Sequence, residues 1–147
     1  MEHILTMLIF FPAVAAILGF LIDKDSMRQF AIVVTFVEFV LSMILYYNFD
    51  VNSADVQFMV NIPIIKSYGI NYLIGADGIS LFLIIMITFM TMIAVIGLTE
   101  KRDVKNLIIT MLFLEMTMVG VFAAFDVILF YIFWELTIIP MFYIIGF

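Results

Sequence analysis

The sequence predicts an all-α polytopic membrane protein, with five transmembrane helices and a short extracytoplasmic β-hairpin between the second and third helices. Of its 147 residues, 67% are hydrophobic and 12% are charged, whereas soluble proteins contain about 45 to 50% apolar and about 25% charged residues. The mean hydropathy is +1.30. The apolar residues form runs of about 20, the length that a helix needs to cross a bilayer. We therefore expect one membrane domain over residues 1–147.

The first two predicted helices cover residues 3–22 and 27–47. Pro12 lies inside the first helix, and we expect it to kink the helix or loosen its hydrogen bonds, as membrane helices allow. No basic residue precedes this apolar run, so we do not expect a cleaved signal peptide. Ahead of the second helix, Ser26 and Gln29 have the spacing of a capping box.

The connection at residues 48–76 is longer than a structureless loop in a compact protein usually is. Residues 56–62 and 69–74 are rich in β-branched and aromatic side chains, and Pro63 and the turn at 66–69 separate them. This pattern predicts a short hairpin that lies on the membrane surface.

The last three predicted helices cover residues 78–98, 104–124 and 127–147. Asp77 and Asp103 stand directly before the first two of these helices, where a side-chain carboxylate can cap free backbone N–H groups. Because the turn between the last two helices is short, we expect these helices to be antiparallel neighbours. Gly120 and Ala124 are four residues apart, which allows a close approach of the two backbones.

Two polar stripes lie on the predicted helices. Thr35 and Ser42 share a face with Glu38, so we expect that face to contact protein rather than lipid. On the third helix, Thr88 and Thr91 share a face. We interpret their hydroxyl groups as hydrogen-bonding partners of the backbone or of a neighbouring helix; a polar lining for water is the alternative.

Basic residues are concentrated in two of the connections. The chain has six Lys and Arg residues, and the second connection holds only Lys66. The first and third connections hold Lys24, Arg28, Lys101, Arg102 and Lys105. By the positive-inside rule these two connections are cytoplasmic, and the N-terminus and hairpin lie outside. The last helix ends at residue 147 without a basic flank or polar tail, so we expect a truncated chain.

Three acids, Glu38, Glu115 and Glu135, lie near the middle of predicted helices, whereas every basic residue lies in a connection. An ionisable side chain at that depth costs from about 2.5 kcal/mol upward and is by default a functional candidate. Burial disfavours the charged form of a carboxyl group, so such acids can exchange protons without a metal ion. We take Glu135 and Glu115 as the catalytic, proton-transferring candidates. Glu38 is a possible site residue that a structural role also explains.

The surroundings of Glu135 add two possible site residues, Tyr131 and Pro140. Pro140 lacks the N–H that would bond the carbonyl of Leu136, which leaves an acceptor for water next to the acid. Glu115 and Glu135 are also at matching depth, about 16 and 14 Å of helical rise from the turn between their helices. If the two helix faces converge, the two acids can share a proton.

Several kinds of chemistry are excluded. The chain has no Cys, which excludes disulfides and thiolate metal sites. It also lacks a glycine-rich phosphate loop, a histidine cluster and a nucleophile motif, and its single histidine, His3, is expected to be solvated at the membrane edge. We therefore expect no metal site, no bound cofactor and no nucleic-acid partner for this chain.

Three segments carry a resemblance to a known family. Residues 131–141, preceded by residues 120–126, closely resemble the antiporter-like M subunit (chain 4 type) of proton-translocating NADH:quinone oxidoreductase, respiratory complex I. Residues 75–81 resemble the signature at the start of the third helix in the same family. Pro140 and Met141 are similar to the M type rather than the related L and N types. The resemblance covers the whole chain but only the N-terminal part of a family member.

The resemblance implies a membrane-arm subunit that translocates protons in a bacterial plasma (inner) membrane. NADH, FMN, iron–sulfur clusters and quinone would be bound by other subunits, and the partners would be the lipid bilayer and the other membrane subunits, especially the L and N types. In the family, the acid at the position of Glu135 pairs with a lysine on a later helix. That lysine is missing here, so this chain is not expected to pump alone.

Other readings of the sequence remain open. Mrp-type cation/proton antiporters and membrane-bound hydrogenases share the ancestry of the M subunit, so the chain can instead be a component of one of these. A small structural membrane fragment with inert acids is a further alternative.

Overall fold

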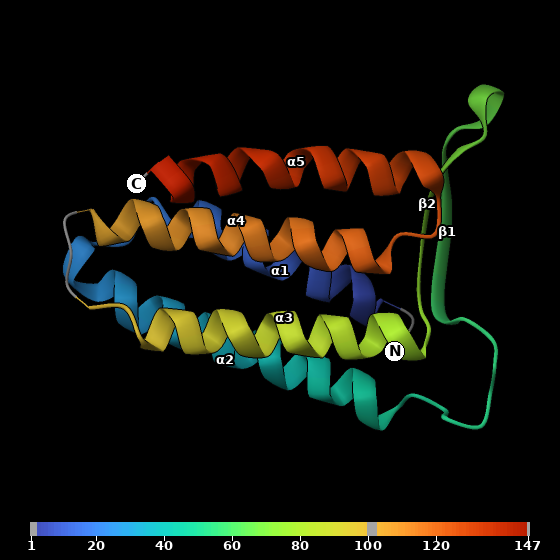
Figure 1. Ribbon diagram of the computed structural model, residues 1–147, viewed down its shortest axis with the longest axis horizontal. Coiled ribbons are helices and arrows are strands. Elements are labelled where there is room, and N and C mark those ends of the chain that lie inside the picture. Colours follow the sequence, from blue (N-terminus) through green and yellow to red (C-terminus); the bar gives the residue numbers. More distant parts are fainter. Residues whose placement is uncertain (1–2, 100–102, 147) are drawn as a thin grey trace.

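The computed structural model describes residues 3–99 and 103–146, and within them it has five α-helices and one two-stranded antiparallel sheet. The helices run side by side along the molecule, and the hairpin lies across one end of them (Figure 1). The helices are α1 (Ile4–Gly19), α2 (Lys24–Tyr47), α3 (Gly78–Ile96), α4 (Val104–Ala123) and α5 (Val127–Gly146). The strands β1 (Gln57–Ile65) and β2 (Ile70–Ala76) flank the short 3₁₀ turn η1 (Lys66–Tyr68).

Four of the helices, α2 to α5, are long and apolar enough to cross a membrane. They contain between 19 and 24 residues. The first helix, α1, has 16 residues and therefore rises about 24 Å, less than a hydrocarbon core of about 30 Å. The predicted sequence of five helices with a hairpin between the second and third is confirmed. The expectation that all five cross the bilayer holds, by length and composition, for α2 to α5.

The start of α2 differs from the prediction. The helix begins at Lys24, because Asp23 is the extended residue before it and the backbone N–H of Ser26 already donates to the Asp23 carbonyl (3.1 Å). Ser26 therefore lies inside the first turn, and the predicted capping box with Gln29 is wrong. Pro12, in contrast, lies inside α1 as expected, and the helix continues past it to Gly19.

The two predicted aspartate caps behave differently. The Asp77 carboxylate accepts a hydrogen bond from the N–H of Ser80 (2.8 Å), and the Ser80 hydroxyl accepts one from the N–H of Asp77 (2.9 Å). This reciprocal pair is a capping box at the start of α3, and the bond from Ser80 lowers the pKa of Asp77. Asp103 also stands directly before α4, but it has a left-handed backbone and its side chain makes no capping bond. Asn106 donates to its carboxylate instead (2.9 Å).

The hairpin is longer than predicted. Pro63, expected to lie between the two runs, sits within β1 opposite Asn71. In a two-stranded sheet each strand is an edge, so a proline that cannot donate a hydrogen bond is tolerated there. The chain reverses through η1 and Gly69, whose φ of 65° lies in the left-handed region that favours glycine.

The hairpin is fastened to the turn between α4 and α5. The N–H of Phe125 donates to the carbonyl of Leu73 (2.8 Å), and the N–H of Asn71 donates to the Asp126 carboxylate (3.3 Å). The bond that Asp126 accepts from the N–H of Leu129, with further backbone bonds, holds the pKa of Asp126 below its ordinary value. The hairpin and the turn at Asp126 therefore lie at the same end of the molecule, as the predicted topology requires (Figure 1).

At the opposite end of the molecule, basic side chains donate hydrogen bonds to backbone carbonyl groups at helix ends. Arg28 donates to the carbonyl of Ile96 at the end of α3 (2.7 Å), and Lys105 donates to the carbonyl of Phe20 after α1 (3.0 Å). Cations are favoured at helix C-termini because the last carbonyls have no partner in the helix. Of the other basic residues in the third connection, Lys101 and Arg102 lie outside the described residues.

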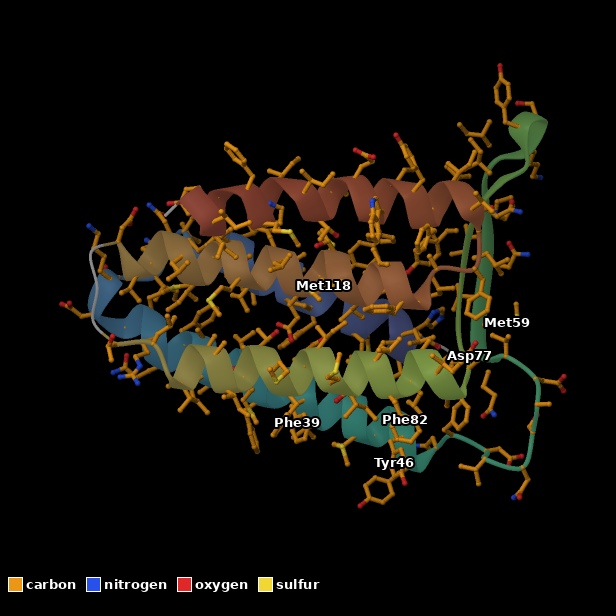
Figure 2. All side chains as sticks on the ribbon, in the orientation of Figure 1. Phe39, Tyr46, Met59, Asp77, Phe82 and Met118 are labelled. Atoms are coloured by element: carbon orange, nitrogen blue, oxygen red, sulfur yellow. The ribbon has the colours of Figure 1, made fainter. Side chains whose placement is uncertain are left out.

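Helix α4 is at the centre of the packing. It contacts each of the other four helices, whereas α5 packs against α4 and touches β2. A Cβ on Gly120 would lie 2.5 Å from the ring of Phe133, so the predicted close approach of α4 and α5 is confirmed. On the other side of the bundle, α2 packs against α3, with the rings of Tyr46 and Phe82 centred 6.2 Å apart (Figure 2).

Candidate functional site

The polar stripe of α2 faces the interior of the bundle. Thr35, Glu38 and Ser42 are all fully buried, which confirms that this face contacts protein. The hydroxyl groups of Ser42 and Thr88 are 2.9 Å apart and join α2 to α3. The interpretation of Thr88 as a helix-linking residue is therefore supported by a direct contact.

Two acids are buried in this interior. Glu38 on α2 and Glu115 on α4 are 0% and 1% exposed, and none of their four carboxyl oxygens has a hydrogen-bond partner among the described residues. Their helices contact each other, and Val34 and Leu112, about one turn before the two acids, belong to the same buried hydrophobic cluster. Helix packing thus brings together two residues that are 77 positions apart in the chain.

The lack of hydrogen bonds has a local cause. Of the Ser42 and Thr88 hydroxyl groups, one donates its proton to the other, and the second donates to a backbone carbonyl of its own helix. Thr35 donates its hydroxyl proton to a backbone carbonyl one turn earlier in its own helix, that of Ala31. Thr117 on α4 does the same. The hydroxyl groups on these helices are therefore already committed, and they leave the acids without a donor.

The pair also has no counter-charge. Neither α1 nor α3 contains an Asp, Glu, Lys, Arg or His residue. The basic residues of α2 and α4 lie in or near the first turn, and even Arg28 and Lys105 are ten residues before Glu38 and Glu115 respectively, which corresponds to about 15 Å along a helix. Two carboxyl groups in such an environment favour states in which at least one is protonated.

Glu115, unlike Glu38, is part of the wall of a pocket. The pocket, of about 400 Å³, lies between α3 and α4. Most of the other lining side chains are apolar: Met86, Ile87, Met90, Ala94, Met111, Leu114 and Met118, the last of which is labelled in Figure 2, with Ile144 from α5. Thr91 is the other polar residue at this wall. The pocket leads to Glu115 and not to Glu38.

Glu135, unlike Glu38 and Glu115, is not buried in the bundle. The buried residues of α5 are Leu129, Phe133 and Pro140, and at about 100° per residue they fall within about 40° of one another. Glu135 is about 200° around the helix from Phe133 by the same measure, and it is exposed. Its carboxylate is therefore on the outward face of α5, away from α4.

The other predicted residues of α5 do not form one site with Glu135. Tyr131 is one turn earlier on the outward face and is 59% exposed. Pro140 is buried and faces α4. The condition for a proton shared by Glu115 and Glu135, that their helix faces converge, is not met, because Glu115 faces the bundle interior.

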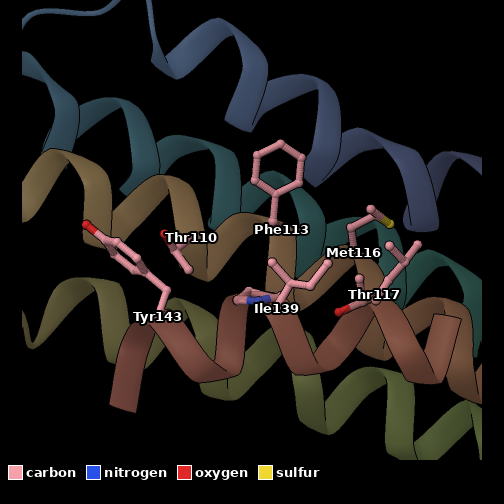
Figure 3. Close-up of a pocket in the computed structure, with 8 residues that line it drawn as sticks. Thr110, Phe113, Met116, Thr117, Ile139 and Tyr143 are labelled. Carbon is pink, nitrogen blue, oxygen red and sulfur yellow. The ribbon is translucent and has the colours of Figure 1, made fainter. Parts of the chain in front are cut away.

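Pro140 lines a second pocket, of about 370 Å³, between α4 and α5 (Figure 3). Its wall consists of Thr110, Phe113, Met116 and Thr117 from α4 and of Leu136, Ile139, Pro140 and Tyr143 from α5. The hydroxyl protons of Thr110 and Thr117 are donated to backbone carbonyls of α4. The pocket is therefore chiefly an apolar surface and carries no acid.

Sequence reasoning gave Glu38 less weight as a site residue than Glu115, and the structure buries both acids. The spacing of Thr35, Glu38 and Ser42 correctly placed the acid on an inward face. Which acid lies across from it depends on how α2 packs against α4, and the chain shows no local signal for that contact. Among residues 3–99 and 103–146, no group of three or more His, Asp or Glu side chains could hold a metal ion.

Comparison with known proteins gives relatives but no family model, since none matches the chain. Chain 4 of the NADH-ubiquinone oxidoreductase of Arabidopsis thaliana is 35% identical over 144 residues, which cover 95% of this chain and 29% of the relative. Subunit M of the NADH-quinone oxidoreductase of Rhodobacter capsulatus is 34% identical over 154 residues, which cover 99% of this chain and 30% of the relative.

The name of a third relative refers to F(420)H(2) instead of NADH. Subunit M of the F(420)H(2) dehydrogenase of Methanosarcina mazei is 33% identical over 157 residues, which cover 99% of this chain and 30% of the relative. The chain thus spans about a third of the length of the curated relatives that it matches. Over nearly all of its own length, it is homologous to a portion of the subunit called M or chain 4 in these oxidoreductases and dehydrogenases.

Proposed function

We propose that this chain is the N-terminal part of a membrane-arm subunit of NADH:quinone oxidoreductase, which translocates protons coupled to electron transfer from NADH to quinone. The observation that carries the proposal is the 34% identity to an NADH-quinone oxidoreductase subunit M over 99% of the chain. The four helices of membrane-spanning length and the acids within them agree with a role in moving protons through a bilayer. NADH, FMN, iron–sulfur clusters and quinone would then be bound by other subunits.

In this proposal Glu135 is the residue that meets the rest of the machinery. It lies nine residues after Asp126, about 14 Å into the helix, on a face that this chain leaves uncovered. A carboxyl group facing lipid at that depth costs from about 2.5 kcal/mol upward, so another helix must cover it in the assembled protein. The relatives are about three times as long as the aligned region, and their remaining segments, or a neighbouring L- or N-type subunit, would supply that helix and a basic partner.

The proposed location is a bacterial plasma membrane, with the hairpin and N-terminus outside. Because the chain has no Cys, a single introduced cysteine reports one position. In intact cells, an impermeant thiol reagent should label Ser53→Cys, in the loop before β1, and should not label Ser26→Cys or Asn106→Cys at the opposite end. All three should react after permeabilisation. Labelling of Ser26→Cys and Asn106→Cys but not Ser53→Cys in intact cells would reverse the topology.

A second molecule is a candidate for the electron donor of the proposed complex. The relative from Methanosarcina mazei is a subunit of an F(420)H(2) dehydrogenase and matches 99% of the chain, which favours reduced F420 as the alternative. Affinity purification of the tagged chain from its native membranes, followed by acceptor reduction with NADH and with reduced F420, separates the two. We expect NADH oxidation to co-purify. Activity with reduced F420 alone would replace the proposed donor, and a chain that purifies alone without either activity would contradict the proposal.

A further inference from the structure

We infer that Glu38 and Glu115 form a single two-carboxyl site that holds one proton between α2 and α4 and exchanges it through the pocket beside Glu115. The proposed function gives its central role to Glu135, and the sequence pointed to Glu115 as a separate proton-transferring candidate. The two-carboxyl site is a separate unit on other elements. Its existence rests on burial and packing, and only its use in translocation rests on the proposed function.

The first argument is geometric. The two side chains are 0% and 1% exposed and come from two helices that contact each other. All four of their oxygens lack a partner among the described residues. An unpaired buried polar group costs about 1 to 3 kcal/mol, so four such atoms in one place call for an explanation. In the site that we infer, one proton between the two acids gives one oxygen of each a partner and removes one of the two buried charges.

The second argument is chemical. A protonated carboxyl group donates its O–H to the carboxylate beside it, and such charge-assisted bonds are short and roughly twice as strong as neutral ones. When the pair takes up one proton, two carboxylates become one carboxylate and one carboxylic acid, and the net charge of the pair changes from two negative charges to one. Release of the proton restores the two carboxylates, and no other bond changes. Like charges in close proximity make the two protons leave in separate steps that belong to the pair.

The third argument is the absence of another charge at that depth. Neither α1 nor α3 contains an ionisable acid, base or histidine. In α5, Glu135 is turned to the outward face. The charged residues of α2 and α4 other than the pair are Lys24, Asp25, Arg28 and Lys105, all in or next to the first turn. Within the described residues, the two acids are therefore each other's only charged neighbours in the core.

The fourth argument is access. The pocket of about 400 Å³ between α3 and α4 includes Glu115 in its wall and does not include Glu38. Glu115 is therefore the exchanging member, and Glu38, which is 0% exposed, is the inner member. A proton enters and leaves through one carboxyl group and is retained by two.

The test is an infrared titration of the protonated carboxyl band of the full chain in lipid nanodiscs. The samples are the wild type, Glu38→Gln, Glu115→Gln and the double variant, with Glu135→Gln as the matched control on the outward face. For a coupled pair, the wild-type curve has two steps that are not the sum of the two single-variant curves, and the double variant loses both. Glu135→Gln should leave both steps in place.

Wild-type steps that equal the sum of the single-variant curves would overturn the inference, because the acids would then titrate independently. If a glutamine variant does not fold, Glu38→Met and Glu115→Met remove the acid without burying an amide and serve the same comparison. The titration requires no electron transfer. Coupled steps together with unimpaired proton translocation in Glu38→Gln would leave the site standing and remove its role in translocation.

Discussion

Glu115 and Glu135 lie at similar depths, eleven and nine residues from Asp126 on either side of one turn, yet their surroundings are opposite. Glu115 is 1% exposed inside the group of helices α1 to α4, which also encloses Glu38. Glu135 is exposed on the outward face of α5. The depth of an acid follows from its distance to the end of its helix, whereas its role depends on which face the packing turns inward.

The helices explain the difference. α4 is in contact with every other helix, so an acid on its inner face meets other residues of this chain. α5 packs against α4 through the side that carries Phe133 and leaves the remainder of its surface open. The two interior acids are therefore enclosed by helices of this chain, while the proposed function gives Glu135 a partner from outside it.

The junction between the two regions is the most sensitive point. Gly120→Val should lower the free energy of unfolding by about 3 kcal/mol, at the upper end of the usual cost of overpacking, because a Cβ there already lies 2.5 Å from the Phe133 ring. Gly78→Val is the matched control, since a Cβ on Gly78 has nothing within 4 Å. Denaturant unfolding in micelles measures both. Equal stability of the two variants would show that α5 is not held closely at this contact.

The interior acids should reduce stability, and Glu135 should not. A buried polar group without a hydrogen-bond partner costs about 1 to 3 kcal/mol, so we expect the double variant Glu38→Met/Glu115→Met to gain about 2 kcal/mol in the free energy of unfolding. Glu135→Met on the outward face should stay within about 0.5 kcal/mol in the isolated chain. An equal gain in both variants would remove the distinction between the regions.

An acid with hydrogen-bond partners behaves in the opposite way to the interior pair. Asp77→Ala should cost about 1 kcal/mol of stability, the usual value for a side-chain cap, because the Asp77 carboxylate accepts the N–H of Ser80. Asp103→Ala removes no capping bond and should cost less. Unfolding measurements on both variants compare them, and similar losses would indicate that the Asp77 bond contributes nothing.

The direction of the Asp77 pKa shift determines how the stabilisation by this cap depends on pH. The pKa of Asp77 is lowered in the folded state by the bond from Ser80, so its contribution is present above the pKa of the unfolded chain and is lost as the pH falls through the folded pKa. The stability difference between wild type and Asp77→Ala should therefore shrink on acidification. A difference that is constant down to strongly acidic pH would contradict the assignment of Asp77 as an ionised cap.

Much of the fold could be predicted from the sequence because it depends on local patterns. Apolar runs, short turns and the Asp77 cap placed the five helices within three residues of their observed ends at the described termini. The start of α2 was misplaced because Ser26 and Gln29 match a capping box whether or not Asp23 already begins the helix. Pro63 was read as a breaker, although each strand of a predicted two-stranded hairpin is an edge, where proline is tolerated.

The candidate site was less predictable, because it depends on contacts between distant segments. Composition identified Glu38, Glu115 and Glu135 as unusual, and the Thr35–Ser42 spacing placed Glu38 inward. The convergence of Glu38 with Glu115, rather than of Glu115 with Glu135, results from the rotation of α4 against α2 and α5. Neither residue spacing nor depth determines that rotation.

The measurement that tests the proposed function most directly is proton translocation by the assembled complex carrying Glu135→Gln. In inverted membrane vesicles driven by NADH, we predict that proton uptake is abolished, because the amide has the shape of the carboxyl group but cannot bind and release a proton. NADH oxidation with an artificial acceptor should be retained, and the variant subunit should be present in the complex at the wild-type level. Normal proton uptake by a fully assembled Glu135→Gln complex would contradict the account.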